Sequence, residues 1–181
     1  MSPRISSPMT IEFALLGLLD RKSMHGYELH REFTSLQGVG LVWSVKLSLL
    51  YALLEKLEAA GLVVSTYLPG ESSPPRKQYS LTPAGRESYM NWRQSPVEHP
   101  RDMRQDFLAR LYFAGLAGSA AARRLLQRQR AACLSWLEED DRQAQQFGST
   151  HPFEQLVFDF RIRQVQAMVG WLDGVEGRLE P

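Results

Sequence analysis

Four histidines and one cysteine are the side chains of this sequence best suited to metal binding or nucleophilic catalysis. His25 and His30 are five positions apart, whereas two imidazoles that bind one metal ion from a helix are four apart. His99 and His151 are distant from both, and Cys133 follows two alanines in a helical stretch, as a buried apolar residue does. The sequence also has no glycine-rich phosphate loop and no Gly-x-Ser-x-Gly elbow. It therefore predicts no enzyme, no metal site and no cofactor.

The composition predicts a globular protein of ordinary charge. The chain has 181 residues, of which 44% are hydrophobic and 23% charged, and these proportions exclude a disordered or fibrous chain. Its net charge is only +1, so any surface for nucleic acid must be local. No segment approaches the roughly 20 apolar residues of a membrane span. Because the only cysteine rules out an internal disulfide, we expect a soluble cytoplasmic protein.

Residues 10–95 show the pattern of three helices, a β-hairpin and a fourth helix. The third helix is the clearest, because Leu47, Leu50, Leu54 and Leu57 form one apolar stripe before Gly61. A short segment rich in β-branched residues, 62–68, and a second short segment, 76–81, flank a proline-rich loop and predict the hairpin.

The ends of this region carry separate signals. Thr82 followed by Pro83 is an N-cap followed by an N1 proline, which predicts the start of the fourth helix. Residues 1–9 contain two prolines and three serines, so we expect a flexible arm there. Met9 is an alternative start of the chain.

This order of elements predicts a winged helix-turn-helix, in which the third helix enters the DNA major groove and the hairpin contacts the backbone. Away from the leucine stripe, the helix and the residues before it carry mainly short side chains, which fit a groove. An ordinary solvated helix face is the alternative, although such a face usually carries more long charged side chains. The residues on the predicted groove side are Ser44, Val45, Ser48, Ala52, Glu55 and Ala59, with Leu49 and Tyr51 on its flanks.

Two further segments could contact phosphates. Arg76 and Lys77 follow two prolines at the hairpin tip, Ser73-Pro74-Pro75, which would hold both cations at a fixed height; a solvated charged turn is the alternative. His25-Gly26-Tyr27-Glu28 opens the second helix, whose backbone N–H groups attract phosphate, and His25 or Tyr27 could add a donor. The alternatives are a core position for Tyr27 and a helix-start hydrogen bond for His25.

The chain after Pro96 and Pro100 is predicted to be wholly helical, over residues 102–117, 119–147 with Ser119 as N-cap, and 152–178. These helices have broad apolar stripes that about 80 residues cannot cover by themselves. We therefore expect residues 96–181 to form a helical dimerisation domain. The residues expected to pair the subunits are Phe107, Leu111, Phe153, Leu156, Phe160, Met168, Trp171 and Leu172.

The sequence resembles the PadR family of bacterial transcriptional regulators. The resemblance rests on the His-Gly-Tyr-Glu segment at 25–28, the Leu-Tyr…Leu-Glu…Gly-Leu pattern of 50–63 and the Pro-Arg-Lys…Tyr-x-Leu-Thr pattern of 75–85. Residues 92–97 and 107–111 resemble the Vir-type C-terminal region of many members. The resemblance implies a homodimeric winged-helix repressor in which Tyr51 and the residues before it touch DNA and Arg76 and Lys77 are wing contacts.

This chain also departs from the family pattern. Ala52 stands where many members have proline, and Ser48-Leu49 stand where many have Gly-Thr, so the operator of other members cannot be assumed for it. We expect Ser44, Lys46, Ser48 and Leu49 to select the DNA sequence. A winged helix used only for protein contacts is the alternative, and its mark would be an acidic or apolar wing.

An effector is a further expectation that the resemblance implies. Some members of the family bind planar aromatic compounds at the dimer interface. Trp43 and Trp92 are the aromatic candidates for such a pocket. A position in the hydrophobic core is the alternative for both tryptophans, and it is the one we favour. The predicted fold is thus mainly α with a small β-hairpin, a winged helix-turn-helix followed by helices that dimerise.

Overall fold

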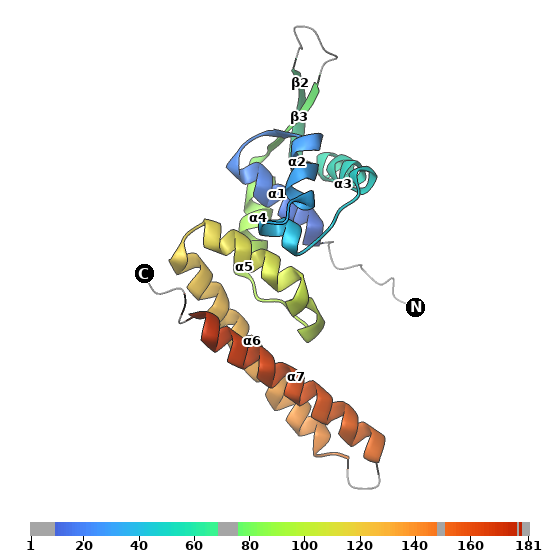
Figure 1. The fold of residues 1–181 in the computed structure, drawn as a ribbon, viewed down its shortest axis with the longest axis vertical. Helices are drawn as coiled ribbons and strands as arrows, with labels where there is room; N and C mark the ends of the chain where they lie inside the picture. The colour runs from blue at the N-terminus through green and yellow to red at the C-terminus, as the bar shows by residue number, and fades with distance from the viewer. Residues whose placement is uncertain (1–9, 69–75, 148–150, 177, 179–181) are drawn as a thin grey trace. The chain divides into compact units, whose positions relative to one another are not determined.

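The computed structural model describes residues 10–68, 76–147, 151–176 and 178, which form two compact units. The first unit comprises Met1–Arg93 together with Leu108–Phe113, and the second comprises Gln94–Phe107 together with Ala114–Pro181. Figure 1 shows the elements of both units. The N-terminal arm expected at residues 1–9 and the wing tip Ser73-Pro74-Pro75 lie outside the described residues.

The first unit is a helical domain with a small antiparallel sheet. In the sheet, β3 lies between β1 and β2, with Tyr79 opposite Met24 and Leu81 opposite Val63. The two-residue strand β1 was not predicted, because two residues are too few to show an alternating pattern. The elements in chain order are α1 (Thr10–Arg21), β1 (Met24–His25), α2 (Gly26–Thr34), the 3-10 helix η1 (Gly38–Leu41), α3 (Leu47–Ala59), β2 (Val63–Leu68), β3 (Arg76–Leu81) and α4 (Pro83–Gln94).

Two predicted helix ends are confirmed in atomic detail. Gly61 has a φ of +70° after α3, and the N–H of Leu62 donates to the carbonyl of Leu57 at 3.0 Å, as in a glycine C-terminal cap. Thr82 Oγ1 accepts from the N–H of Gly85 at 3.0 Å and caps α4. These two local signals fix both ends of the segment that contains the hairpin.

The leucine stripe of α3 faces the core as predicted, with one exception. Leu50, Leu53, Leu54 and Leu57 are buried, whereas Leu47 is 38% exposed because it lies in the first turn, beyond the edge of the core. Val45 was expected on the groove side but is 3% exposed. The helical projection failed at Val45 because α3 begins only at Leu47.

An aromatic cluster fills the other side of this core. Trp92 stacks on Phe13 with a centroid distance of 5.5 Å and meets Phe113 edge-on at 6.0 Å. Tyr89 meets Phe113 edge-on at 5.8 Å, and Trp43 is also buried in this core. Both tryptophans thus occupy the core positions that were the alternative to an effector pocket.

The second unit is built around two long helices, α6 (Ser119–Ala144) and α7 (Pro152–Glu176). They come after η2 (Pro100–Arg104) and α5 (Asp106–Leu116) in the chain, and they run antiparallel, side by side (Figure 1). Arg130 Nε donates to Asp173 Oδ1 at 2.6 Å, between the first half of α6 and the end of α7. Gly118, with a φ of +111°, occupies the N-cap of α6, so the prediction of Ser119 as N-cap was wrong by one residue.

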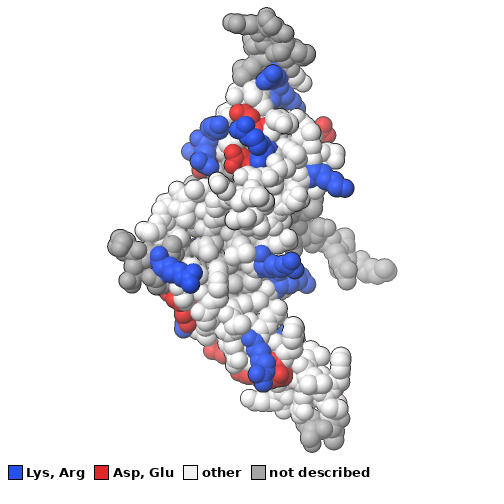
Figure 2. All heavy atoms as spheres, viewed as in Figure 1, with Lys and Arg blue, Asp and Glu red and all other residues white. Residues whose placement is uncertain are grey.

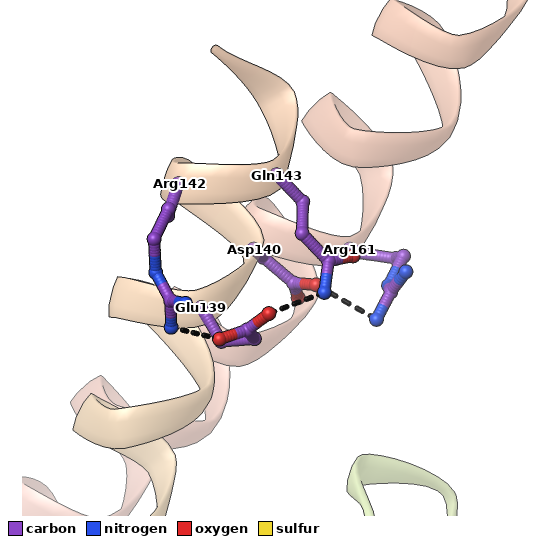
Figure 3. A network of polar contacts seen from close by, with 5 residues as sticks. All are labelled: Glu139, Asp140, Arg142, Gln143 and Arg161. Atoms are coloured by element: carbon purple, nitrogen blue, oxygen red, sulfur yellow. Dashed lines mark hydrogen bonds and ion pairs between the residues drawn. The ribbon is translucent and has the colours of Figure 1, made fainter. Parts of the chain in front are cut away.

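At the other end of the α6–α7 hairpin, a buried carboxylate of one helix pairs with an arginine of the other. Asp140 on α6 is 3% exposed and pairs with Arg161 on α7 at 2.7 Å. Its neighbour Glu139 accepts hydrogen bonds from Arg142 and Gln143 of the same helix (Figure 3). Burial raises the pKa of Asp140, and Arg161 acts in the opposite direction. The pair is therefore a further ion pair between α6 and α7, and unlike the exposed Arg130–Asp173 pair it includes a buried carboxylate.

α7 buries one side and exposes large apolar residues on the other. Phe158, Val165 and Leu172 are buried, whereas Phe153, Leu156 and Phe160 are exposed by 72%, 68% and 65%. We call these last three residues, which share one side of the helix, the α7 apolar face. No helix in the described part of the chain is long and apolar enough to cross a membrane.

Candidate nucleic-acid interface

Three segments that are far apart in the sequence meet around one open hollow of about 600 Å³ in the first unit. The start of α2 supplies His25 and Tyr27, α3 supplies Tyr51, and β3 supplies Arg76 and Lys77. Gly26 and Glu28 complete its lining. The sequence assigned the five residues to DNA contact separately, and the structure places them beside one another.

Gly26 lets α2 and α3 approach closely at this hollow. A Cβ atom at Gly26 would lie 2.5 Å from Cε1 of Tyr51, which is closer than side chains tolerate. The glycine is therefore needed for the contact with the tyrosine ring and not for an unusual φ angle. Sequence reasoning recognised the His-Gly-Tyr-Glu segment but could not see this contact, because Tyr51 is 25 residues further along the chain.

Some of the hydrogen-bonding groups at the start of α2 already have partners within the chain. Glu28 accepts from the N–H of His25 at 2.8 Å, and this hydrogen bond holds the pKa of Glu28 below its usual value. The His25 ring N–H at Nδ1 donates to the carbonyl of Lys77 at 3.1 Å, which ties β1 to β3. Tyr27, in contrast, is 68% exposed and is not a core residue. Tyr27 is thus the donor at this helix start that faces solvent.

The groove side of α3 is exposed over its N-terminal half. Ser44, Lys46, Ser48 and Leu49 are all exposed, and so is Tyr51. Lys46 is the N-cap residue with an extended backbone, so Ser44 and Lys46 precede the helix while Ser48 lies in its first turn. Four residues expected to select the DNA sequence therefore lie together at the helix start, where a helix that enters a groove reaches base edges.

The two adjacent cations of the hairpin have different surroundings. Arg76 is exposed, and Figure 2 shows Lys and Arg atoms at the outer end of the β2–β3 hairpin. Lys77 Nζ instead donates to Glu58 Oε2 at 2.7 Å and lies 5.1 Å from the ring centre of Tyr79. Glu58, on the last turn of α3, also accepts from the hydroxyl of Ser65 on β2.

Sequence reasoning missed Glu58 and Ser65. One signal was present, because a carboxylate in the last turn of a helix opposes the helix dipole and is expected only with a cation nearby. Three donors and acceptors from α3, β2 and β3 therefore meet where the hairpin lies against α3. The hydrogen bond from Lys77 raises its own pKa and lowers that of Glu58.

The described residues contain no group of three His, Cys, Asp or Glu side chains that could hold a metal ion. Cys133 is buried, and this burial raises the pKa of its thiol. A thiol with a raised pKa is a poor nucleophile at neutral pH.

Known proteins resemble nearly the whole chain. The negative transcriptional regulator PadR of Bacillus subtilis (strain 168) is 26% identical over 176 residues, which cover 91% of this chain and 94% of the relative. The crystal structure of B. subtilis PadR in complex with operator DNA is 20% identical, covers 97% of this chain and 100% of its own, and has a TM-score of 0.49. The crystal structure of B. subtilis PadR in complex with p-coumaric acid is 22% identical, covers 97% and 99%, and has a TM-score of 0.43.

Family models match both regions of the chain. Residues 15–91 match the transcriptional regulator PadR-like family, and they contain the α2 start, α3 and the β2–β3 hairpin that form the hollow. Residues 103–180 match the virulence activator alpha C-terminal family. Residues 15–91 are therefore a PadR-like transcriptional regulator domain, and residues 103–180 are a virulence activator alpha type of C-terminal region.

Proposed function

We propose that this regulator is a repressor that binds a specific operator as a homodimer. In this proposal α3 is the recognition helix in the major groove, and the β2–β3 hairpin is the wing on the DNA backbone. The observation that carries it is the exposed start of α3, with its short side chains, beside a hollow that gathers Tyr27, Tyr51 and Arg76.

The exposed residues of the interface have two separate tasks in this proposal. Ser44, Lys46, Ser48 and Leu49 reach base edges, where a hydroxyl or ammonium finds purine acceptors and a leucine contacts a thymine methyl. Tyr27 and Arg76 bind phosphates and therefore contribute affinity without sequence choice.

The homodimer is supported by the α7 apolar face. Phe153, Leu156 and Phe160 are three large exposed apolar side chains grouped on one side of one helix, and a grouped apolar surface marks an interaction site more often than scattered residues do. In the view of Figure 2, the end of the α6–α7 hairpin where α7 begins carries mainly uncharged atoms. We place the subunit contact of residues 96–181 on this face, with a total buried area above roughly 2,000 Å², as in obligate assemblies. Phe107 and Leu172, in contrast, are buried inside the chain and support the interface from within.

Repression and relief by an effector complete the proposal. The Bacillus relative is named a negative regulator, which supports repression by this chain. A small aromatic compound is the proposed effector. Since Trp43 and Trp92 are buried in the core of the first unit, an effector would contact them only after local rearrangement. Native mass spectrometry with p-coumaric acid, and release of bound operator by the same compound, test this part directly.

Selection of bound duplexes from a random DNA pool is the experiment that tests operator recognition. We expect one preferred, roughly two-fold symmetric sequence, because a dimer presents two recognition helices. Retention of all duplexes alike would contradict the proposal and favour a winged helix used for protein contacts.

Two variants then separate the two tasks by fluorescence anisotropy with the selected operator and a random duplex. Ser48→Gln should reduce discrimination by about 1–3 kcal/mol for each base contact that the substitution removes, while leaving non-specific binding. Arg76→Ala should weaken binding to both duplexes and lower the salt slope by about one unit per subunit. A changed sequence preference in Arg76→Ala alone would reverse the assignment.

A further inference from the structure

Lys77 is the cation that the sequence pairs with Arg76, yet the structure gives it an internal partner. Its Nζ lies 2.7 Å from Glu58 Oε2, and the two side chains are only 30% and 33% exposed. Arg76, one residue earlier, is exposed and forms no ion pair with the rest of the described chain. Since successive residues of a strand point to opposite faces, the two adjacent cations face different surroundings.

The backbone and the side chain of Lys77 are both held by residues outside the hairpin. Its carbonyl accepts from the ring N–H of His25, which precedes α2, and its ammonium binds Glu58 on α3 and lies over Tyr79. The backbone contact fixes β3 against β1, and the side-chain contact fixes β3 against the recognition helix. Of the two contacts, the one with Glu58 bears on phosphate binding, because it holds the ammonium itself.

Glu58 also binds the other strand of the hairpin. The hydroxyl of Ser65 on β2 donates to Oε1, while Lys77 on β3 donates to Oε2. Ser65 and Lys77 are not opposite one another in the sheet, because Ser65 pairs with Tyr79 and Lys77 pairs with Tyr67. The carboxylate of Glu58 therefore spans both strands and sets the direction in which the hairpin leaves α3.

We propose that Glu58, Ser65 and Lys77 form a clasp that positions the wing relative to the recognition helix, and that Lys77 is a positioning residue and not a phosphate contact. This inference rests on the proposed DNA-binding function. In a winged helix the wing and the recognition helix contact the same duplex, so the angle between them decides whether both contacts form together. The clasp fixes that angle in the free protein, before DNA binds.

The sign of the effect at Glu58 distinguishes a clasp from a phosphate contact. If Lys77 bound phosphate, removal of the competing Glu58 carboxylate would free the ammonium and strengthen DNA binding. If the three residues form a clasp, the loss of Glu58 weakens binding as much as the loss of Lys77 does. The two changes also act on one contact, so their effects should not add.

The test uses the full-length protein with Glu58→Gln, Lys77→Met and the double variant, titrated with the selected operator at several salt concentrations. We expect each single variant to bind about three- to tenfold more weakly, the double variant to bind no more weakly than the worse single variant, and the salt slope to stay unchanged. Arg76→Ala is the matched comparison, because it should lower the slope by about one unit per subunit.

Arg86→Met is the control for loss of an ion pair elsewhere in the first unit, because Arg86 Nε pairs with Asp20 Oδ1 at 3.2 Å on the α4 and α1 helices. It should alter neither the affinity nor the slope. The proposal is overturned if Lys77→Met lowers the slope by about one unit per subunit, if Glu58→Gln fails to weaken binding, or if the two effects add.

A second measurement on the free protein separates this proposal from the proposed function. Amide hydrogen exchange of β2 and β3 should be faster in Glu58→Gln and in Lys77→Met, to a similar degree, and unchanged in Arg76→Ala and Arg86→Met. Unchanged exchange in both clasp variants overturns the clasp. Faster exchange, together with an absence of any preferred operator in the wild-type protein, keeps the clasp and overturns only the DNA-binding role.

Discussion

The first unit and the α6–α7 hairpin bury their large apolar side chains to different extents. In the first unit, the helices α1 to α4, a sheet and part of α5 enclose the large apolar side chains, and its aromatic cluster is built around Trp92 and Phe113. In the hairpin, two helices can cover each other along only one side, so the α7 apolar face stays exposed. Two antiparallel helices have a single seam, whereas a layered domain has an interior.

This difference separates two kinds of apolar residue. Phe113 is completely buried within the chain, so its contribution to the free energy of unfolding needs no second copy. Phe160 gains burial only if something covers it, so its contribution depends on protein concentration. The same residue type thus supports folding in one region and, in the proposed dimer, assembly in the other.

The largest effect is expected from charge on the α7 apolar face. The double variant Leu156→Glu and Phe160→Glu should be monomeric at micromolar concentration, and operator binding should fall about 10²- to 10⁴-fold because the two half-sites are no longer linked. Sedimentation velocity and anisotropy measure the two effects. Gln166→Glu, at an exposed polar position of the same helix, is the control and should remain dimeric. A dimeric double variant would show that the subunit contact lies elsewhere.

The next effect is the loss of the aromatic cluster. Phe113→Ala removes a ring that contacts Tyr89, Trp92 and Tyr112, and it should lower the free energy of unfolding by about 3–5 kcal/mol. Phe160→Ala should cost less than about 1 kcal/mol at concentrations where the chain is monomeric, because its ring is exposed. Urea denaturation at two protein concentrations measures both values. Equal costs for the two phenylalanines would remove the distinction between the two regions.

The buried pair of the hairpin predicts a pH-dependent effect. Arg161→Met leaves the Asp140 carboxylate without its cation, and we expect a loss of about 1–3 kcal/mol in the free energy of unfolding at pH 7. Because burial already raises the pKa of Asp140, its stabilising contribution is greatest below the ordinary Asp value and is lost as pH rises through the folded pKa. Removal of Arg161 raises that pKa further, so the deficit of the variant should grow with pH.

Urea denaturation between pH 4 and pH 8, at one protein concentration, checks this prediction. Arg163→Met is the matched control, because it removes an exposed pair with Asp159 on the same helix and should leave the free energy of unfolding nearly unchanged. The same deficit for Arg161→Met at both ends of the pH range would mean that Arg161 acts through its contact with the Phe158 ring and not through its ion pair with Asp140.

The smallest effect is expected at Gly26. Gly26→Ala places a methyl group against the ring of Tyr51, and it should cost about 1 kcal/mol of stability, because the half-exposed ring can move aside. Operator binding should fall about tenfold, since the moved ring disturbs the start of α2 and α3 together. Gly115→Ala, where nothing lies within 4 Å of the added Cβ, should leave binding unchanged. Normal binding by Gly26→Ala would remove Tyr51 from the interface.

The element order could be predicted from the sequence because its signals are local. The leucine stripe of α3, Gly61 and the Thr82-Pro83 pair act over a few residues, and the structure confirms each of them. The family assignment, and with it the prediction that the chain is not an enzyme, also followed from short motifs and is confirmed by the matched family models.

The partners of each side chain were decided by the tertiary structure. Sequence spacing could not show that Gly26 lies against the ring of Tyr51, that Val45 turns inward before α3, or that Trp92 stacks on Phe13. The clearest example is the adjacent pair Arg76 and Lys77. In the sequence they look like two equal cations. In the structure, neighbouring residues of β3 point to opposite faces, so Arg76 is exposed whereas Lys77 forms an ion pair with Glu58 of α3. Such contacts join residues distant in the chain, so the fold has to form before they exist.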